Sequence, residues 1–268
     1  MCSVVVSRKN IGLILILLLM SVLAKAQQYT GTEGLIHVPT ADMDSICSAR
    51  IGAHYMNKEF TPDKFAFEGE KYNTASIYLS VTPFKWIQLA YTQTLMKFHK
   101  YMNSNAKTGF YSKDRYFSVR VQPLRERKWW PSVVIGANDI WGEQDGKSGS
   151  FYFRNYYVAL SKHYELYGNI IGAHAAYRHW KKDFNSKWNG PVGGLTFQPF
   201  FAKELRFIGE YDGDGVNVGA DYMLLRHVLI QAALQHGHYF NAGACLYLDL
   251  DGVSKKIRKK KENNKDKI

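Results

Sequence analysis

The sequence predicts an all-β protein, and specifically an antiparallel up-and-down transmembrane β-barrel of about twelve strands. Three observations carry this prediction: a hydrophobic period of two, segments longer than ordinary soluble strands, and connections that alternate in length. The chain has 268 residues, of which 46% are hydrophobic and 15% aromatic. This composition excludes a fully disordered chain. A mean hydropathy of −0.30 excludes a bundle of membrane helices but not a barrel, whose strands alternate apolar and polar residues.

The period of two runs through the body of the chain. Ile77 and Leu79 alternate with Tyr78 and Ser80, which places an apolar face opposite a polar one. Most of the segments span 9 to 12 residues, whereas soluble strands average about five or six and tilted membrane strands need about 9–11. The predicted strands are 48–57, 71–81, 86–97, 115–123, 131–139, 151–162, 167–177, 190–198, 203–211, 215–223, 227–235 and 239–249.

The connections between these segments alternate between long and short along the first two thirds of the chain. The long ones are 58–70, 98–114, 140–150 and 178–189, and the short ones are 82–85, 124–130, 163–166 and 199–202. The last three, 212–214, 224–226 and 236–238, are all tight. Outer-membrane barrels have short periplasmic turns and longer external loops, whereas a β-sandwich needs no such alternation. A soluble secreted β-sandwich remains the alternative fold.

Three predicted strands end in proline followed by an apolar residue. The pairs are Pro83-Phe84, Pro123-Leu124 and Pro199-Phe200. Proline lacks the N–H that a central strand needs, so it marks a strand end. With Trp86, Trp129 and Trp130 nearby, these residues suit an aromatic girdle at a membrane interface. The alternative is a soluble hairpin corner with buried aromatic side chains.

The chain divides into four parts. Residues 1–26 have the basic start, the apolar run 11–23 and the Ala24-Lys25-Ala26 site of a cleaved secretory signal peptide, with an uncleaved anchor as the alternative. Residues 27–47 form a strand-poor periplasmic or plug segment. Residues 48–253 form the barrel. Residues 254–268 form a basic tail that we expect to be disordered.

The positive charge is concentrated in the tail. The whole chain carries a net charge of +12, the chain without residues 1–26 carries +9, and the tail alone carries +6. The barrel region is therefore close to neutral. A tail rich in Lys and Arg is either solvated or bound to anionic phospholipid, and an exported protein is not expected to meet nucleic acid.

The histidines and cysteines predict no metal site and no cofactor. His236 and His238 flank a glycine, but no third ligand is in view. His174 borders a strand end and is interpreted as an interface or loop residue. Cys47 and Cys245 are the cysteines that remain after signal cleavage, and whether they pair is left open.

The stretch 210–215 combines three carboxylates with two glycines. It resembles part of a calcium loop without the remaining ligands, and Asp-Gly between alternating segments favours a hairpin turn. The predicted turn is Asp212, Gly213, Asp214 and Gly215. Buried charges need partners, so Glu210 is expected to pair with lumen-facing arginines. The predicted lumen charge cluster is Arg120, Arg154, Arg206 and Glu210.

Two regions resemble a known family. The stretch 34–43, GLIHVPTADM, resembles the opening of YjbH-like proteins after the signal peptide. The stretches 190–195, GPVGGL, and 210–214, EYDGD, resemble that family's later half. The resemblance implies an outer-membrane β-barrel linked to exopolysaccharide production and secretion. It carries over no catalytic residue.

The predicted function is a non-enzymatic outer-membrane barrel that assists exopolysaccharide production or export. The expected partners are outer-membrane lipid, exopolysaccharide and its export machinery. The alternatives are an outer-membrane enzyme acting on lipid or glycan, and a soluble secreted β-sandwich that binds a partner. No G-x-S-x-G, P-loop or dinucleotide fingerprint is present, so no catalytic residue is assigned.

Overall fold

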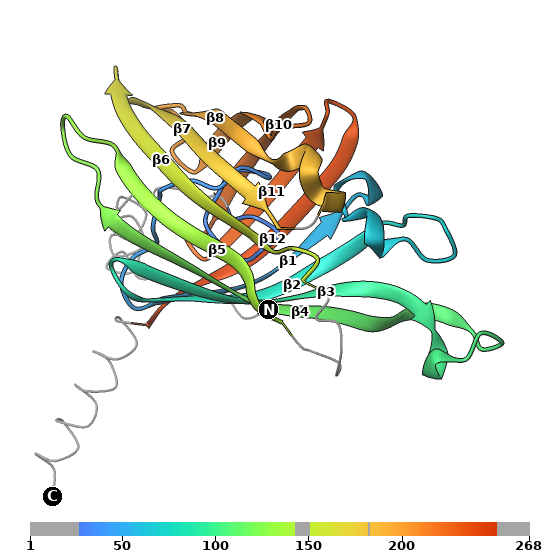
Figure 1. The fold of residues 1–268 in the computed structure, drawn as a ribbon. Helices are drawn as coiled ribbons and strands as arrows, with labels where there is room; N and C mark the ends of the chain where they lie inside the picture. Colours follow the sequence, from blue (N-terminus) through green and yellow to red (C-terminus); the bar gives the residue numbers. More distant parts are fainter. Residues whose placement is uncertain (1–26, 143–150, 182, 251–268) are drawn as a thin grey trace, which may run out of the picture.

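The structure, a computed structural model, describes residues 27–142, 151–181 and 183–250, which form twelve antiparallel strands in one closed barrel (Figure 1). Each strand pairs with its neighbours in sequence, and β1 pairs with β12. The strands are β1 Ser48–Met56, β2 Thr74–Phe84, β3 Ile87–His99, β4 Thr108–Leu124, β5 Ser132–Gly142, β6 Asn155–Leu166, β7 Asn169–Trp180, β8 Gly190–Gln198, β9 Leu205–Tyr211, β10 Val216–Leu224, β11 Val228–Gln235 and β12 Tyr239–Asp249.

This architecture confirms the predicted barrel. The β-sandwich alternative is wrong, because the pairing of β1 with β12 closes a single sheet and leaves no second sheet to pack against. The predicted signal peptide, 1–26, and the predicted tail, 254–268, lie outside the described residues.

The two faces of the barrel are reversed relative to a soluble protein. On β2, Ile77 and Leu79 point outward and are 45% and 44% exposed, whereas Tyr78 and Ser80 point inward and are buried. A polar interior with an apolar exterior is stable where the exterior meets lipid. The exposed outward-facing side chains of other strands include Leu89, Phe117, Ile135, Val158, Leu160, Leu195, Phe207, Ile230, Leu234 and Leu246.

The strand limits differ most from the prediction at β4, which begins at Thr108 rather than at residue 115. Pairing between β3 and β4 continues as far as His99 with Thr108, whereas β2 last pairs with β3 at Thr94. The two strands therefore form a hairpin that extends beyond its neighbour (Figure 1). Residues 108–114 mix polar and aromatic types without a clean period, so sequence alone assigned them to a loop.

Two of the three predicted proline corners occur as bulges inside strands. The register shifts between Val81 and Phe84 on β2 and between Val121 and Leu124 on β4, and each shift contains the proline. Pro199 follows the end of β8. A bulge accommodates proline because it interrupts the ladder where the missing N–H would donate. The neighbouring aromatics are exposed, as an interfacial girdle requires: Phe84, Trp86, Trp129, Trp130, Phe200 and Phe201.

The longest connections all lie at one end of the barrel. One end, called here the short-turn end, carries the connections 85–86, 125–131, 167–168, 199–204 and 225–227, together with the start of β1 and the end of β12. The other, called here the long-loop end, carries 57–73, 100–107, 143–154, 181–189, 212–215 and 236–238. Three long loops contain short 3₁₀ helices, at Lys58–Phe60, Asp63–Phe65, Lys100–Met102 and Asp183–Trp188. None of the helices among the described residues has the length and apolarity needed to cross a membrane.

Candidate functional site

Residues 27–44, called here the plug, fill the lumen. All of them are buried except Asp42, which is half-buried, and Leu35 and Val38 are completely shielded from solvent. The plug forms no regular element, and its own bridges are limited to Gln27 with Glu33 and Gly34 with Pro39. A buried irregular backbone needs external hydrogen-bond partners, so lumen side chains must supply them.

Arg120 on β4 supplies three of these hydrogen bonds. Its guanidinium donates to the carbonyl oxygens of Glu33, Thr40 and Asp42, the last two at 2.6 Å. The neighbouring lumen residue Gln122 donates to the carbonyl of Ala41 at 2.7 Å. The fixed fork of an arginine suits this task because its several N–H groups diverge toward separate acceptors.

Glu210 on β9 binds the plug as a hydrogen-bond acceptor, whereas Arg120 binds it as a donor. Its carboxylate accepts from the backbone N–H groups of Ile36, His37 and Val38, at 3.0, 2.8 and 3.1 Å. Asn217 on β10 donates to the same carboxylate at 2.8 Å. Four donors compensate the lost hydration of one buried carboxylate. Glu210 therefore anchors residues 36–38, called here the plug tip, rather than pairing with an arginine.

The predicted charge cluster is corrected by these contacts. Arg120, Arg206 and Glu210 are all buried in the lumen, but each has separate partners. Arg206 donates to Asp221 on β10 at 3.0 and 2.6 Å. Arg154 is not a lumen residue: it precedes β6, donates to the carbonyls of Asp139 and Ile140 and lies over the Phe151 ring. The prediction counted Arg154 within a strand because it began that strand at residue 151.

The predicted hairpin turn joins β9 to β10. Asp212 N–H donates to the carbonyl of Gly215, and Gly213 has φ +99°, which favours glycine. The Asp212 carboxylate accepts from the N–H groups of Asp214 and Gly215 at 3.0 and 2.9 Å. These contacts make the carboxylate the internal acceptor of a tight turn.

His37 connects the tip of the plug to this turn. Its Nδ1 lies 3.3 Å from Asp212 Oδ2, and the Tyr29 hydroxyl contacts Nε2 at 2.9 Å. Arg178 on β7 donates to the carbonyls of both His37 and Asp212 at 2.6 Å. Burial and the Arg178 charge lower the pKa of His37 to about 4, against the opposing effect of Asp212. Burial raises the pKa of Asp212, but its hydrogen bonds, from His37 first, leave that pKa well below its usual range.

We predict that the contribution of His37 to docking of the plug tip decreases as the pH falls from about 6.5 toward about 4. In that window a released His37 takes up a proton and a docked one does not, so docking loses at most about 1.4 kcal/mol per pH unit. Hydrogen exchange of residues 35–38 measures the effect. His37→Gln removes this titrating group, so exchange in the wild type, relative to the variant at the same pH, should become faster as the pH falls. An identical pH dependence in both proteins would contradict the assignment to His37.

The long-loop end of the lumen is covered by aromatic side chains. Phe60, Phe65, Phe153, Trp180 and Trp188 form one buried cluster with Tyr29 of the plug. The rings of Trp188 and His37 meet at 4.9 Å between centroids. The loops therefore pack directly on the plug, and this end of the lumen is closed.

The short-turn end of the lumen holds a cavity of about 730 Å³. It is lined on one side by residues 41–46, which comprise the end of the plug and the two residues after it. Strand ends and short turns of the barrel line the other sides. This volume is typical of small-molecule sites. The lining is rich in groups that form hydrogen bonds and ion pairs: Asp42, Asp44, Lys85, Gln122, Arg125, Glu126, His163, Tyr164, Glu165, Gln198 and Arg206.

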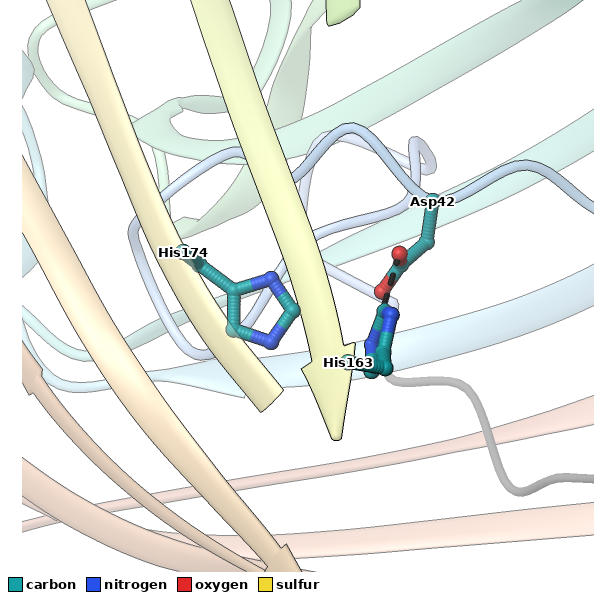
Figure 2. Close-up of side chains that lie close together, drawn as sticks. All are labelled: Asp42, His163 and His174. Atoms are coloured by element: carbon teal, nitrogen blue, oxygen red, sulfur yellow. Dashed lines mark ion pairs between the residues drawn. The ribbon is translucent and has the colours of Figure 1, made fainter. Parts of the chain in front are cut away.

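Three potential metal ligands meet beside this cavity. Asp42 of the plug, His163 of β6 and His174 of β7 point toward one another (Figure 2), and their ligand atoms lie within 4.8 Å of one another. His163 Nε2 is 3.7 Å from Asp42 Oδ1, and its Nδ1 is 2.7 Å from Glu126 Oε2. Ser161 lies 2.8 Å from His174 Nδ1 and accepts from the Ala41 N–H at 2.8 Å.

Sequence reasoning missed this group for a specific reason. The predicted strand ended at residue 162, so His163 fell in a turn, whereas β6 continues to Leu166. The alternating pattern, continued by one residue, would have placed His163 on the lumen face with Ser161. Asp42 comes from a segment without periodicity, and no local signal places it beside β6 and β7.

Cys47 and Cys245 carry free thiols in the described structure. Cys245 is buried on β12 opposite Gly52 of β1, and Cys47 is half-buried immediately before β1.

The family profile described as "Exopolysaccharide biosynthesis protein YbjH", for the family YjbH, matches residues 26–268. The chain belongs to the YjbH family. This confirms the resemblance drawn from the stretches 34–43, 190–195 and 210–214, two of which form the plug tip and its docking turn. The family name links the chain to exopolysaccharide biosynthesis at the level of the family.

Two solved structures are similar to this YjbH-family chain. Outer membrane phospholipase A from Escherichia coli is 12% identical, covers 76% of this chain and 95% of its own, and has a TM-score of 0.33. A Salmonella typhi outer membrane phospholipase dimer with bound calcium is 13% identical, covers 75% and 89%, and has the same TM-score. No curated protein matches the chain.

Proposed function

We propose that this YjbH-family protein is a non-enzymatic, plugged outer-membrane barrel that assists exopolysaccharide production or export from its periplasmic side. The observation that carries the proposal is the lumen itself, which is closed by the plug and the aromatic loops and retains a polar cavity at the short-turn end. Outer-membrane barrels direct their short turns toward the periplasm. The cavity then faces the compartment through which a polysaccharide passes before export.

The outer-membrane location is supported by the exterior of the barrel. Outward-facing Phe117, Ile135 and Phe207 are about half exposed, and a surface of this kind is insoluble unless lipid or detergent covers it. The exposed aromatics at the short-turn end, among them Trp129 and Trp130, suit the membrane interface. Outer-membrane lipid is therefore the first proposed partner.

The cavity chemistry suits a hydroxyl-rich ligand. Carboxylates, amides and basic groups supply both donors and acceptors, and Tyr164, which is 60% exposed, offers an aromatic surface for stacking. The closed lumen argues against passage of a polymer through this barrel in the plugged state. We therefore propose exopolysaccharide and its export machinery as partners that meet the short-turn end.

An enzymatic alternative draws on one contact, that between the Ser161 hydroxyl and His174 at 2.8 Å, which has the form of a nucleophile and its base. Ser161 is 1% exposed and already accepts the plug N–H of Ala41. A substrate has no route to a hydroxyl in this position while the plug is docked. The geometry therefore favours a structural role for Ser161.

Gene deletion with complementation tests the proposal. We expect a deletion strain to release less exopolysaccharide, and the wild-type gene to restore release. Ser161→Ala removes the contact to His174 and leaves the buried Ala41 N–H without its acceptor, at a cost of about 1–3 kcal/mol. The other plug contacts remain, so the variant should restore release to within about twofold. Unchanged release on deletion would refute the link to exopolysaccharide. Complete loss in Ser161→Ala with a folded barrel would favour an enzyme instead.

A further inference from the structure

Asp42, His163 and His174 bring three potential metal ligands together from the plug and two adjacent strands. His163 Nε2 and Asp42 Oδ1 are 3.7 Å apart, which is longer than a hydrogen bond. The third member, His174, contributes a second imidazole within the same 4.8 Å group (Figure 2). Two imidazoles and one carboxylate are a donor set of zinc sites that keep a position open for water.

We propose that Asp42, His163 and His174 bind one zinc ion, which ties the plug to the wall of the barrel. Zinc bonds of about 2.0–2.1 Å hold tetrahedral donor atoms roughly 3.3 Å apart. The ligand atoms, which lie within 4.8 Å of one another, must move closer together to bind the ion, through rotation of the Asp42 and His163 side chains. Because Asp42 belongs to the plug and both histidines to adjacent strands, one ion crosslinks two parts of the fold.

Glu126 prepares His163 for this role. The His163 Nδ1–H donates to Glu126 Oε2 at 2.7 Å, and the backbone N–H of His163 donates to Oε1 at 2.8 Å. Lys162 contacts the same carboxylate at 3.0 Å. A proton held on Nδ1 leaves the lone pair of Nε2 directed at Asp42. In zinc sites a carboxylate commonly accepts from the far ring nitrogen of a ligating histidine in this way, and it fixes the tautomer and the orientation of the ring.

Both ring nitrogens of His174 have hydroxyl partners: Ser161 Oγ contacts Nδ1 at 2.8 Å and Thr196 Oγ1 contacts Nε2 at 3.3 Å. Zinc binding therefore replaces one of these two contacts, while the other continues to orient the ring. His174 is 5% exposed, which leaves its orientation little freedom. Gly172 makes room for the ring, since a Cβ there would lie 2.7 Å from His174 Nε2.

The cavity provides a path for the ion. His163 and Asp42 side chains are 31% and 11% exposed, and both line the 730 Å³ cavity at the short-turn end. A zinc ion can therefore enter from this end without release of the plug, and water from the cavity can complete its coordination. The inference depends on the plug and its cavity and not on the proposed link to exopolysaccharide.

Calorimetric titration of the full chain with zinc chloride tests the site. The chain is expressed without a histidine tag, recovered from the membrane in detergent and treated with a chelator. We expect one zinc ion per chain. Asp42→Ala and His163→Ala should each weaken binding at least about 100-fold, and Glu126→Gln should weaken it by about 10–100-fold. His227→Ala, an exposed turn histidine, and Cys47→Ser are the controls and should bind like the wild type.

A second readout distinguishes a bridging ion from adventitious binding. Zinc should slow hydrogen exchange at residues 41–42 in the wild type and leave it unchanged in His163→Ala. The folding of every variant, including a third ligand variant, His174→Ala, is first checked by a heat-modifiable band in SDS. If His174→Ala does not fold, His163→Ala decides the question. No binding by the wild type, or wild-type binding by a folded His163→Ala variant, would overturn the proposal.

Discussion

Arg120→Ala is expected to loosen the plug while the barrel stays closed. The substitution removes the donors of three plug carbonyls in a buried site. Each buried carbonyl left without its donor costs about 1–3 kcal/mol, so the loss of all three contacts should cost at least about 3 kcal/mol. Hydrogen exchange of residues 33–42 should therefore become at least about 10²-fold faster. Exchange in the strands should change far less, because the β1–β12 closure does not depend on Arg120.

Arg154→Ala is the matched control for this experiment. Arg154 also donates to two backbone carbonyls, but at the long-loop rim and without contact to the plug. It should leave the exchange of residues 33–42 at the wild-type rate. Equal exchange in wild type and Arg120→Ala would contradict the role of Arg120 as a plug anchor.

Phe207→Arg is expected to block membrane assembly. Phe207 is the third residue of β9, faces outward and is 47% exposed. An arginine that faces lipid costs about 2–4 kcal/mol near the bilayer midplane and less toward the interfaces. Val119 lies between buried Ser118 and Arg120 on β4, so it faces outward. Val119→Arg should block assembly in the same way. The fraction of heat-modifiable protein in the outer membrane measures assembly.

Phe207→Leu is the matched control, since it keeps an apolar side chain at the same position. It should assemble like the wild type. Wild-type levels of folded Phe207→Arg and Val119→Arg protein would show that this face does not meet lipid.

The barrel was predictable because its signal is local and repeated. Each strand carries its own alternation, so the error at β4 left the count and the order of the strands intact. Strand ends were less predictable, since pairing can extend a strand through residues such as 108–114 that have no period of their own. The proline corners were located correctly, but bulges carry β2 and β4 one residue beyond the proline.

The lumen contacts were predictable only in part. Alternation identifies Arg120, Arg206 and Glu210 as inward-facing residues, but it does not reveal their partners. Glu210 binds the N–H groups of residues 36–38, more than 170 positions away in sequence. These donors belong to the backbone of the plug. Backbone partners leave no trace in side-chain composition, so an arginine partner was the natural expectation.

Hydrogen exchange of the plug in the wild-type protein is the most direct test of the central claim, that residues 27–44 fold inside the closed barrel. The amides of Ile36, His37 and Val38 donate to Glu210, and that of Ala41 donates to Ser161. These amides should exchange as slowly as strand amides, although they belong to an irregular segment. Rapid exchange throughout 27–44 in a folded, heat-modifiable protein would place the segment outside the lumen and contradict the account.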